Sequence, residues 1–154
     1  MKKVVLSVVL IMSVLLVVSC KTTKGTGART GTGTATVNDD TFRRIYDRYW
    51  GDLILDGAQK YTVKSGDRLV DISRNFYSDP YYYPLIMLAS KDVVVDQDKI
   101  QPGMELTIPD LQRNLDDSRA KASIRGVIGD CANIEDDRGR ADTARGLRDR
   151  AATL

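Results

Sequence analysis

The fold is decided by the stretch Tyr61-Thr62-Val63-Lys64-Ser65-Gly66-Asp67-Arg68-Leu69-Val70-Asp71-Ile72-Ser73. Its first three residues alternate in the manner of a β-strand, and Ser65-Gly66-Asp67 has the composition of a turn. Asp67 is placed to cap a helix that follows the turn. That helix is indicated by apolar residues at helical spacing, which are Leu69, Ile72, Phe76 and Tyr77.

A second helix and a second strand follow this stretch. Ser78-Asp79-Pro80 predicts the start of the helix, and Pro84 is compatible only with its first turn. The apolar residues of this helix are Leu85, Ile86, Leu88 and Ala89. Pro102-Gly103 predicts a turn before the second strand. The alternating residues of that strand are Met104, Leu106 and Ile108. The predicted order is strand, helix, helix, strand.

Both ends of this unit resemble one family of domains. The stretch Tyr61–Ser73 is similar to the opening of a LysM domain. The segment Ile100-Gln101-Pro102-Gly103-Met104-Glu105-Leu106-Thr107-Ile108-Pro109 is similar to its closing strand. The resemblance implies an α+β fold with a small βααβ LysM domain over residues 60–110. Members of this family bind glycans that contain N-acetylglucosamine, in peptidoglycan or chitin.

The resemblance also implies where the glycan lies. In the family, the sugar occupies a shallow groove between the loop after the first strand and the loop before the second. The implied glycan-binding residues are Ser65, Gly66, Asp67, Arg68 and Leu69 in the first loop, and Lys91, Asp92, Val93, Val94 and Val95 in the second. Gly66 allows a close approach to the backbone, and the valines offer apolar surface to the sugar. Asp67 is either a ligand contact or only a helix cap.

Two positions depart from the family pattern. Arg68 stands where a small hydroxyl residue is usual, and Ser90 stands where asparagine commonly ends the second helix. Arg68 adds bulk and positive charge at the edge of the groove. It therefore either favours a carboxylate of peptidoglycan or narrows the site. The departures leave the expected fold intact but weaken the expectation of ordinary chitin-like specificity.

Residues 39–59 predict a short amphipathic helix and a connector. Asp39 and Asp40 can cap this helix at its start. The apolar residues at helical spacing are Phe42, Ile45, Tyr46, Tyr49 and Leu53. These side chains either pack on the domain that follows or present an aromatic face that stacks on sugars. Packing is the more general role of such rings.

Residues 111–154 predict a C-terminal tail built as an amphipathic helical hairpin. The first apolar stripe consists of Leu115, Ala122, Ile124, Val127, Ile128, Cys131 and Ile134. The second consists of Ala141, Ala144, Leu147, Ala151 and Leu154, after a break near Arg138-Gly139. Either the hairpin folds onto the LysM unit, or it binds a partner protein. Cys131 lies on the apolar side and is expected to be a small buried hydrophobe.

The N-terminus has the form of a lipoprotein signal peptide over residues 1–19. Lys2 and Lys3 precede an apolar run from Val4 to Val18, which is shorter than the ~20 residues of a membrane-spanning helix. The run ends in Val17-Val18-Ser19-Cys20, which resembles a bacterial lipobox and implies that Cys20 is diacylated. Two acyl chains make membrane anchoring stable. The alternatives are an ordinary signal peptide with an incidental cysteine, or an uncleaved anchor.

Residues 20–38 are dominated by glycine and threonine and predict a flexible tether. A chain of roughly twenty such residues has a root-mean-square span of about 25 Å. We therefore expect a protein of the cell envelope, lipid-anchored to a bacterial membrane and facing the periplasm or the cell wall.

The composition removes several classes of function. The sequence contains no histidine, which removes Ser/His/Asp and Cys/His catalysis and the usual imidazole-based zinc sites. Lys+Arg 23 against Asp+Glu 21, without a basic stripe, gives no reason to expect nucleic-acid binding. We expect a protein that is not an enzyme and has no cofactor and no metal site.

The expected function is non-catalytic binding of peptidoglycan glycan strands, which tethers the membrane to the cell wall. Two alternatives stay open. One is an envelope scaffold whose partner protein binds residues 111–154. The other is an accessory part of a cell-wall hydrolase, although the chain has little room for a catalytic domain with two carboxylates in a deep cleft.

Overall fold

The computed structural model describes residues 39–154, so the expected signal peptide, Cys20 and the tether lie outside the described residues. The described residues form six α-helices, three short 3-10 helices and one two-stranded sheet, which makes the fold α+β as predicted. The elements are α1 (Asp39–Tyr49), η1 (Trp50–Asp52), β1 (Gln59–Thr62), α2 (Leu69–Tyr77), η2 (Pro80–Tyr82), α3 (Tyr83–Ala89), η3 (Gln97–Lys99), β2 (Glu105–Ile108), α4 (Leu111–Asp116), α5 (Ser118–Asp137) and α6 (Ala141–Ala152).

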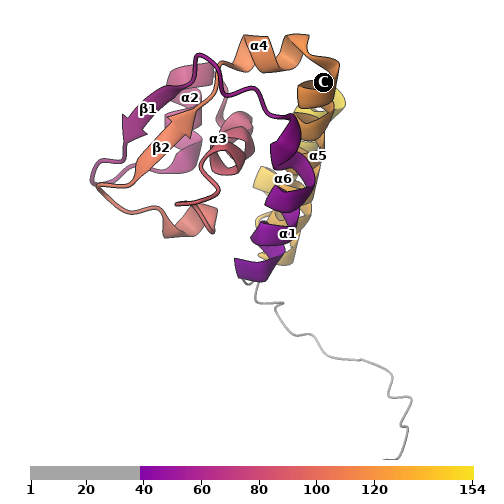
Figure 1. The fold of residues 1–154 in the computed structure, drawn as a ribbon. Helices are drawn as coiled ribbons and strands as arrows, with labels where there is room; N and C mark the ends of the chain where they lie inside the picture. Colours follow the sequence, from indigo (N-terminus) through magenta and orange to yellow (C-terminus); the bar gives the residue numbers. More distant parts are fainter. Residues whose placement is uncertain (1–38) are drawn as a thin grey trace, which may run out of the picture. The chain divides into compact units, whose positions relative to one another are not determined.

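The strand, helix, helix, strand order of the predicted unit is present (Figure 1). Strands β1 and β2 pair in antiparallel fashion, with Tyr61 opposite Leu106. The pairing continues beyond β1, because the Val63 N–H donates to the Met104 carbonyl at 2.9 Å. Leu106 and Ile108 are buried, so β2 supplies the apolar face that α3 packs against.

The first loop differs from its prediction at Asp67. Its carboxylate accepts hydrogen bonds from the Lys64 N–H at 2.8 Å and the Tyr61 hydroxyl at 2.7 Å. Helix α2 begins after Arg68, without a side-chain cap. Asp67 thus closes the turn behind it and does not cap the helix ahead. Gly66 lies at φ +88°, a left-handed conformation that favours glycine in this turn.

The connection between α2 and α3 explains where the second helix begins. Ser78 ends α2 in the left-handed conformation, with φ 60°. The Asp79 carboxylate then accepts a hydrogen bond from the Tyr81 N–H at 2.8 Å and caps η2. Helix α3 therefore starts at Tyr83, beyond the predicted Ser78–Pro80, and Pro84 lies in its first turn as proline requires.

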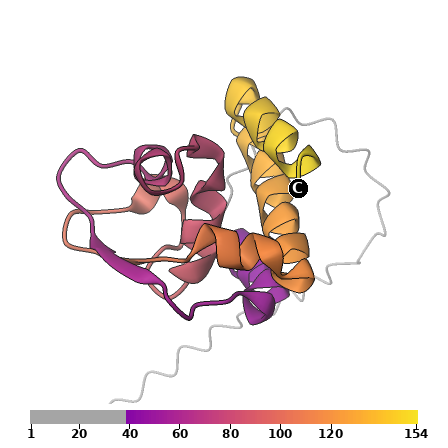
Figure 2. The same ribbon diagram turned by 90° about the horizontal axis from the view of Figure 1, so that it is seen from above.

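Helix α3 is enclosed on both sides. Six consecutive residues, Tyr83–Leu88, are buried. Helix α2 and strand β2 cover one side of α3, and α5 covers the other (Figures 1 and 2). A helix that is apolar all round requires this kind of burial. The tail therefore completes the core of the strand, helix, helix, strand unit.

The tail contains one helix more than predicted. The predicted first helix of the hairpin divides at Asp117, whose carboxylate accepts hydrogen bonds from the N–H groups of Arg119 and Ala120 and starts α5. Helix α4 precedes this break, and α5 packs along α6 as a hairpin. Cys131 is buried on α5, as predicted, and burial raises the pKa of its thiol.

Helix α1 belongs to the same core. Phe42, Ile45 and Tyr46 are buried in the core, and α1 packs against α5. The sugar-stacking interpretation of this helix is therefore wrong for Phe42 and Tyr46, because neither ring is exposed. Among residues 39–154, we find no helix with the length and apolar character that crossing a membrane would require.

Candidate binding site

The first loop contributes three of its five predicted residues to a cavity. Asp67, Arg68 and Leu69 line it, although Leu69 is a core residue that offers little surface. Ser65 and Gly66 are exposed at the tip of the turn and do not line the cavity. A Cβ atom added at Gly66 would have no neighbour within 4 Å. Its backbone conformation, and not a close approach, therefore accounts for glycine at this position.

The predicted residues of the second loop lie elsewhere. Val94 is buried, and its carbonyl accepts a hydrogen bond from the Tyr46 hydroxyl at 2.9 Å. Val93 is exposed. Lys91, Asp92 and Val95 line a different cavity, of about 390 Å³, together with Arg43, Tyr46 and Asp47 of α1. Of the ten predicted residues, three therefore line the cavity beside the first loop, three line the cavity beside α1, and four line neither.

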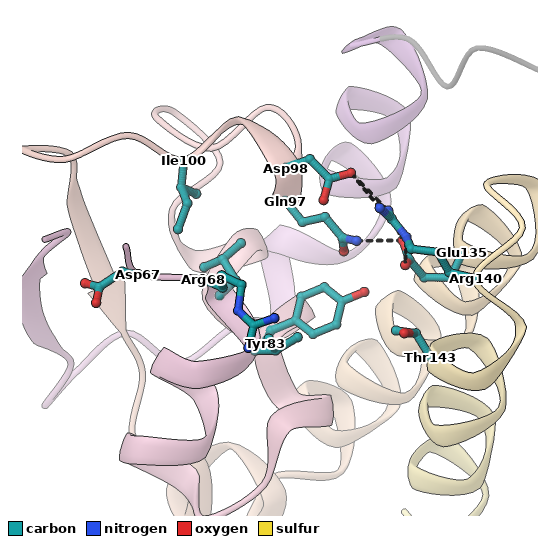
Figure 3. Close-up of a pocket in the computed structure, with 11 residues that line it drawn as sticks. Asp67, Arg68, Tyr83, Gln97, Asp98, Ile100, Glu135, Arg140 and Thr143 are labelled. Carbon is teal, nitrogen blue, oxygen red and sulfur yellow. Dashed lines mark hydrogen bonds and ion pairs between the residues drawn. The ribbon is translucent and has the colours of Figure 1, made fainter. Parts of the chain in front are cut away.

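The cavity beside the first loop has a volume of about 370 Å³, within the range of small-molecule sites (Figure 3). Its walls come from the first loop and the start of α2, the start of α3, the later part of the second loop, and the tail. Besides Asp67, Arg68 and Leu69, the lining residues are Val70, Tyr83, Gln97, Asp98, Ile100, Glu135, Arg140 and Thr143.

Helix η3 brings the later part of the second loop back to the first loop. The Asp96 carboxylate caps η3 by accepting a hydrogen bond from the Asp98 N–H at 3.0 Å. Asp96 also forms an ion pair with Arg138 at the end of α5, at 2.6 Å. Because Asp96 and Arg138 are both largely buried, this pair fixes η3 against the tail.

Charged groups in the cavity are largely paired with one another. Glu135 is buried and binds the Arg140 guanidinium, which also contacts Asp98 at 3.0 Å. The Gln97 amide donates to Glu135 at 2.6 Å. The hydrogen bond to Glu135, followed by that to Asp98, raises the pKa of Arg140 further above its usual value. Arg140 therefore remains a cation.

The two departures from the family pattern have different outcomes. Arg68 extends along the surface, with 72% of its side chain exposed, and its Nε contacts Asp71 at 2.7 Å. Ser90 is buried, and its hydroxyl accepts from the Thr107 N–H at 2.9 Å and donates to the Thr107 carbonyl at 3.3 Å. Ser90 thus joins the end of α3 to β2 and lines neither cavity.

The arrangement is suited to binding by hydrogen bonds. Polar groups and apolar surface converge on one small cavity, as in sites for small polar ligands. Among the described residues, no group of three histidine, cysteine or carboxylate side chains is placed to hold a metal ion. Sequence reasoning missed the lining residues of the tail because nothing local to residues 135–143 indicates that they face the first loop.

Comparison with known proteins identifies the strand, helix, helix, strand unit. Residues 61–109 match the LysM domain model, and this part of the chain is a LysM domain, a class of binding module. The potassium binding protein Kbp of Escherichia coli is similar to this chain, with 45% identity over 53 residues. The match covers 34% of this chain and 36% of Kbp, about a third of each. No solved structure matches.

Proposed function

We propose that this protein binds peptidoglycan through its LysM domain without catalysis and, through a lipid on Cys20, holds the bacterial membrane to the cell wall. The observation that carries the proposal is the LysM domain at residues 61–109, with a cavity of about 370 Å³ beside its first loop. The cavity offers amide, hydroxyl and carboxylate groups, which are the partners that an N-acetylated sugar requires.

The carboxylates of this cavity support binding without turnover. A glycosidase needs one carboxyl group that carries a proton and a second that acts as base or nucleophile. Here Asp98 and Glu135 both contact the guanidinium of Arg140. The arrangement therefore resembles a fixed ionic scaffold more than an acid–base pair. The matching test is that the purified protein releases no soluble muropeptides from sacculi.

A single shallow site of this size is expected to bind weakly. A dissociation constant near 1 mM corresponds to only about −4 kcal/mol. A lipid-anchored domain, however, faces a continuous glycan mesh at high effective concentration. Many weak and reversible contacts can then join the membrane to the wall.

The test of glycan binding is a pull-down of residues 22–154 with purified peptidoglycan sacculi. We compare the wild type with Ile100→Lys, in the cavity beside the first loop, and with Val95→Lys, in the cavity beside α1. The lysine stem can lie along apolar surface while its charge reaches water, so the fold is expected to persist, and circular dichroism checks this. We expect Ile100→Lys to abolish retention and Val95→Lys to preserve it.

The other outcomes are equally informative. Loss of retention with Val95→Lys alone would indicate that the glycan binds in the cavity lined by Lys91, Asp92 and Val95. If the wild type is not retained, peptidoglycan binding is rejected, and the scaffold alternative through residues 111–154 is tested next by cross-linking in cells. The buried apolar side chains of α5 and α6 do not favour that alternative, because they already serve this chain's own core.

Lipid anchoring has its own test. Cells that express the full chain are labelled with a palmitate analogue and compared with cells that express Cys20→Ala. We expect label in the membrane fraction for the wild type and none for the variant. Label that persists in Cys20→Ala would reject Cys20 as the attachment site, while glycan binding by residues 22–154 would be unaffected.

A further inference from the structure

The Tyr83 hydroxyl is the polar group in the cavity that the fold leaves unsatisfied. Tyr83 has no exposed surface, and its hydroxyl has no hydrogen-bond partner among the described residues. The hydroxyls of Tyr46 and Tyr77, in contrast, each donate to a backbone carbonyl at 2.9 Å. A buried polar group without a partner is costly, so a group that enters the cavity and pairs with it gains from doing so.

The tail faces this hydroxyl across the cavity. Figure 3 shows the Tyr83 hydroxyl directed toward Thr143 and toward the Glu135–Arg140 pair. Thr143 belongs to the first turn of α6, and Arg140 precedes that helix. The wall opposite the LysM loops is therefore supplied by residues 135–143, which lie outside the LysM domain match at residues 61–109.

The charges of the cavity indicate a neutral ligand. Its lining includes three carboxylates, from Asp67, Asp98 and Glu135, and two guanidinium groups, from Arg68 and Arg140. Both arginines already contact carboxylates within the protein. An anionic ligand would have to displace those partners in a cavity with an excess of negative charge. A neutral sugar can use the remaining lone pairs and N–H groups without breaking an ion pair.

We infer that the C-terminal tail forms the third wall of the glycan site, and that an uncharged N-acetylglucosamine unit enters beside Thr143, turns that side chain aside and hydrogen-bonds to the Tyr83 hydroxyl, which is buried in the unliganded protein. The inference rests on the proposed peptidoglycan binding. It assigns part of glycan recognition to residues beyond the LysM domain and selects the neutral sugar of the strand over its carboxylate-bearing neighbour.

The test titrates residues 22–154 with soluble, neutral N-acetylglucosamine oligomers to measure their affinity. Retention by sacculi is measured alongside. Tyr83→Phe removes only the hydroxyl, and its matched control is Tyr77→Phe, whose hydroxyl bonds to Pro109 outside the cavity. Thr143→Leu places a larger side chain on the tail side of the cavity. Its control is Ala141→Leu, because Ala141 is exposed and does not line the cavity.

We expect Tyr83→Phe to weaken oligomer binding roughly 5–10-fold, with no loss of thermal stability, because no internal hydrogen bond is removed. Thr143→Leu should weaken it by at least about 10-fold, and both controls should bind as the wild type does. The affinity should change less than about twofold between low and high salt, as for an uncharged ligand.

Distinct results overturn the inference and the proposed function. If the wild type binds sacculi while Tyr83→Phe and Thr143→Leu bind equally well, the tail is not part of the site and the Tyr83 hydroxyl does not contact the sugar. Strong weakening of binding by salt would reject the neutral ligand. Absence of wild-type binding to both sacculi and oligomers would reject the proposed function itself, together with the inference that depends on it.

Discussion

At the scale of single residues, Asn114 shows how one buried amide fixes a connector. Its side chain accepts from the Ile54 N–H at 2.9 Å and donates to the carbonyls of Ile54 and Asp110 at 2.8 Å. The segment before β1 has no sheet partner at Ile54, so α4 supplies its hydrogen bonds. The Asn114 amide thus bonds to both the N–H and the carbonyl of Ile54, as the backbone of a neighbouring strand would. Few other side chains can make both bonds.

Asn114→Ala is expected to lower the free energy of unfolding by about 2–3 kcal/mol, since it leaves backbone groups of Ile54 without partners. Urea denaturation followed by circular dichroism measures the change. Asn75→Ala, at an exposed position on α2, is the matched control and should change stability by less than about 0.5 kcal/mol. Equal effects of the two substitutions would show that the Asn114 hydrogen bonds contribute nothing specific.

Asp67 makes the first loop sensitive to acid. The Lys64 N–H, and next the Tyr61 hydroxyl, hold the pKa of Asp67 below its usual value of 3.8. A pKa that is lower in the folded than in the unfolded state stabilises the protein at pH values above 3.8. That contribution is lost as the pH falls below 3.8 and through the lower folded-state pKa.

Asp67→Asn should therefore be less stable than the wild type at neutral pH, and the difference should shrink on acidification below about pH 4. Thermal midpoints recorded from neutral pH to about pH 2.5 test this. Asp142→Asn, at a side chain that is 97% exposed, is the control and should follow the wild-type curve. A constant difference between Asp67→Asn and wild type at every pH would contradict the proposed role of the Asp67 carboxylate.

At the scale of elements, two glycines of α5 have opposite surroundings. A Cβ atom at Gly126 would lie 2.4 Å from the Tyr49 ring of α1, whereas one at Gly129 would have no neighbour within 4 Å. The Tyr49 ring is held in place by its hydroxyl, which donates to Asp130 at 3.1 Å. Gly126 therefore permits α1 to approach α5, and Gly129 only weakens the helix.

Gly129→Ala is expected to raise the free energy of unfolding by about 0.5–1 kcal/mol, the usual gain of alanine over glycine within a helix. Gly126→Ala receives the same helical gain but displaces Tyr49, so we expect a net loss of about 1 kcal/mol or more. Chemical denaturation of both variants measures the two changes in the free energy of unfolding. A similar gain from both would mean that α1 and α5 do not pack as closely as described.

The elements of the LysM unit could be predicted because local chemistry determines them. Alternation over Tyr61–Val63 and over Met104–Ile108 predicts β1 and β2, and helical spacing from Leu69 to Tyr77 predicts α2. The break at Asp117 was missed because the apolar spacing continues from Leu115 to Ile134 across it. The signal was present in Asp116-Asp117-Ser118, a run of residues that favour helix caps.

The site was less predictable than the elements, and the reason is its distance along the chain. The resemblance to the LysM family pointed to the first loop, and its residues Asp67 and Arg68 line the cavity, whereas Ser65 and Gly66 do not. The tail wall depends on the pairing of Asp98 with Arg140, and the tail offers several arginines that could equally pair with any carboxylate. Local pattern does not choose among such partners, because the packing of α3 against α5 decides the pairing.

At the scale of the whole described segment, residues 39–154 share one core. Buried side chains of α1, the LysM unit and the tail form a single apolar cluster that includes Phe42, Leu85, Ile128 and Leu147. Ion pairs reinforce it, since Arg150 of α6 binds the Asp79 that caps η2. We therefore expect the LysM unit and the tail to unfold together, although the family match covers only the former.

Leu147→Ala in α6 tests whether the LysM unit and the tail unfold together. Leu147 is fully buried, and its truncation should cost about 2–4 kcal/mol. Trp50 of η1 is the one tryptophan of the chain, and the Lys91 ammonium lies 4.7 Å from the centroid of its ring. Its fluorescence therefore reports on the contact between the end of α1 and the second loop. If the core is single, the denaturation midpoint read by Trp50 should fall as far as the midpoint read by helical circular dichroism.

Arg145→Ala, at an exposed position of α6, should move neither midpoint. A Trp50 midpoint that stays at the wild-type value while the helical midpoint falls would make the tail an independent hairpin, and partner binding would again become the better account of α5 and α6.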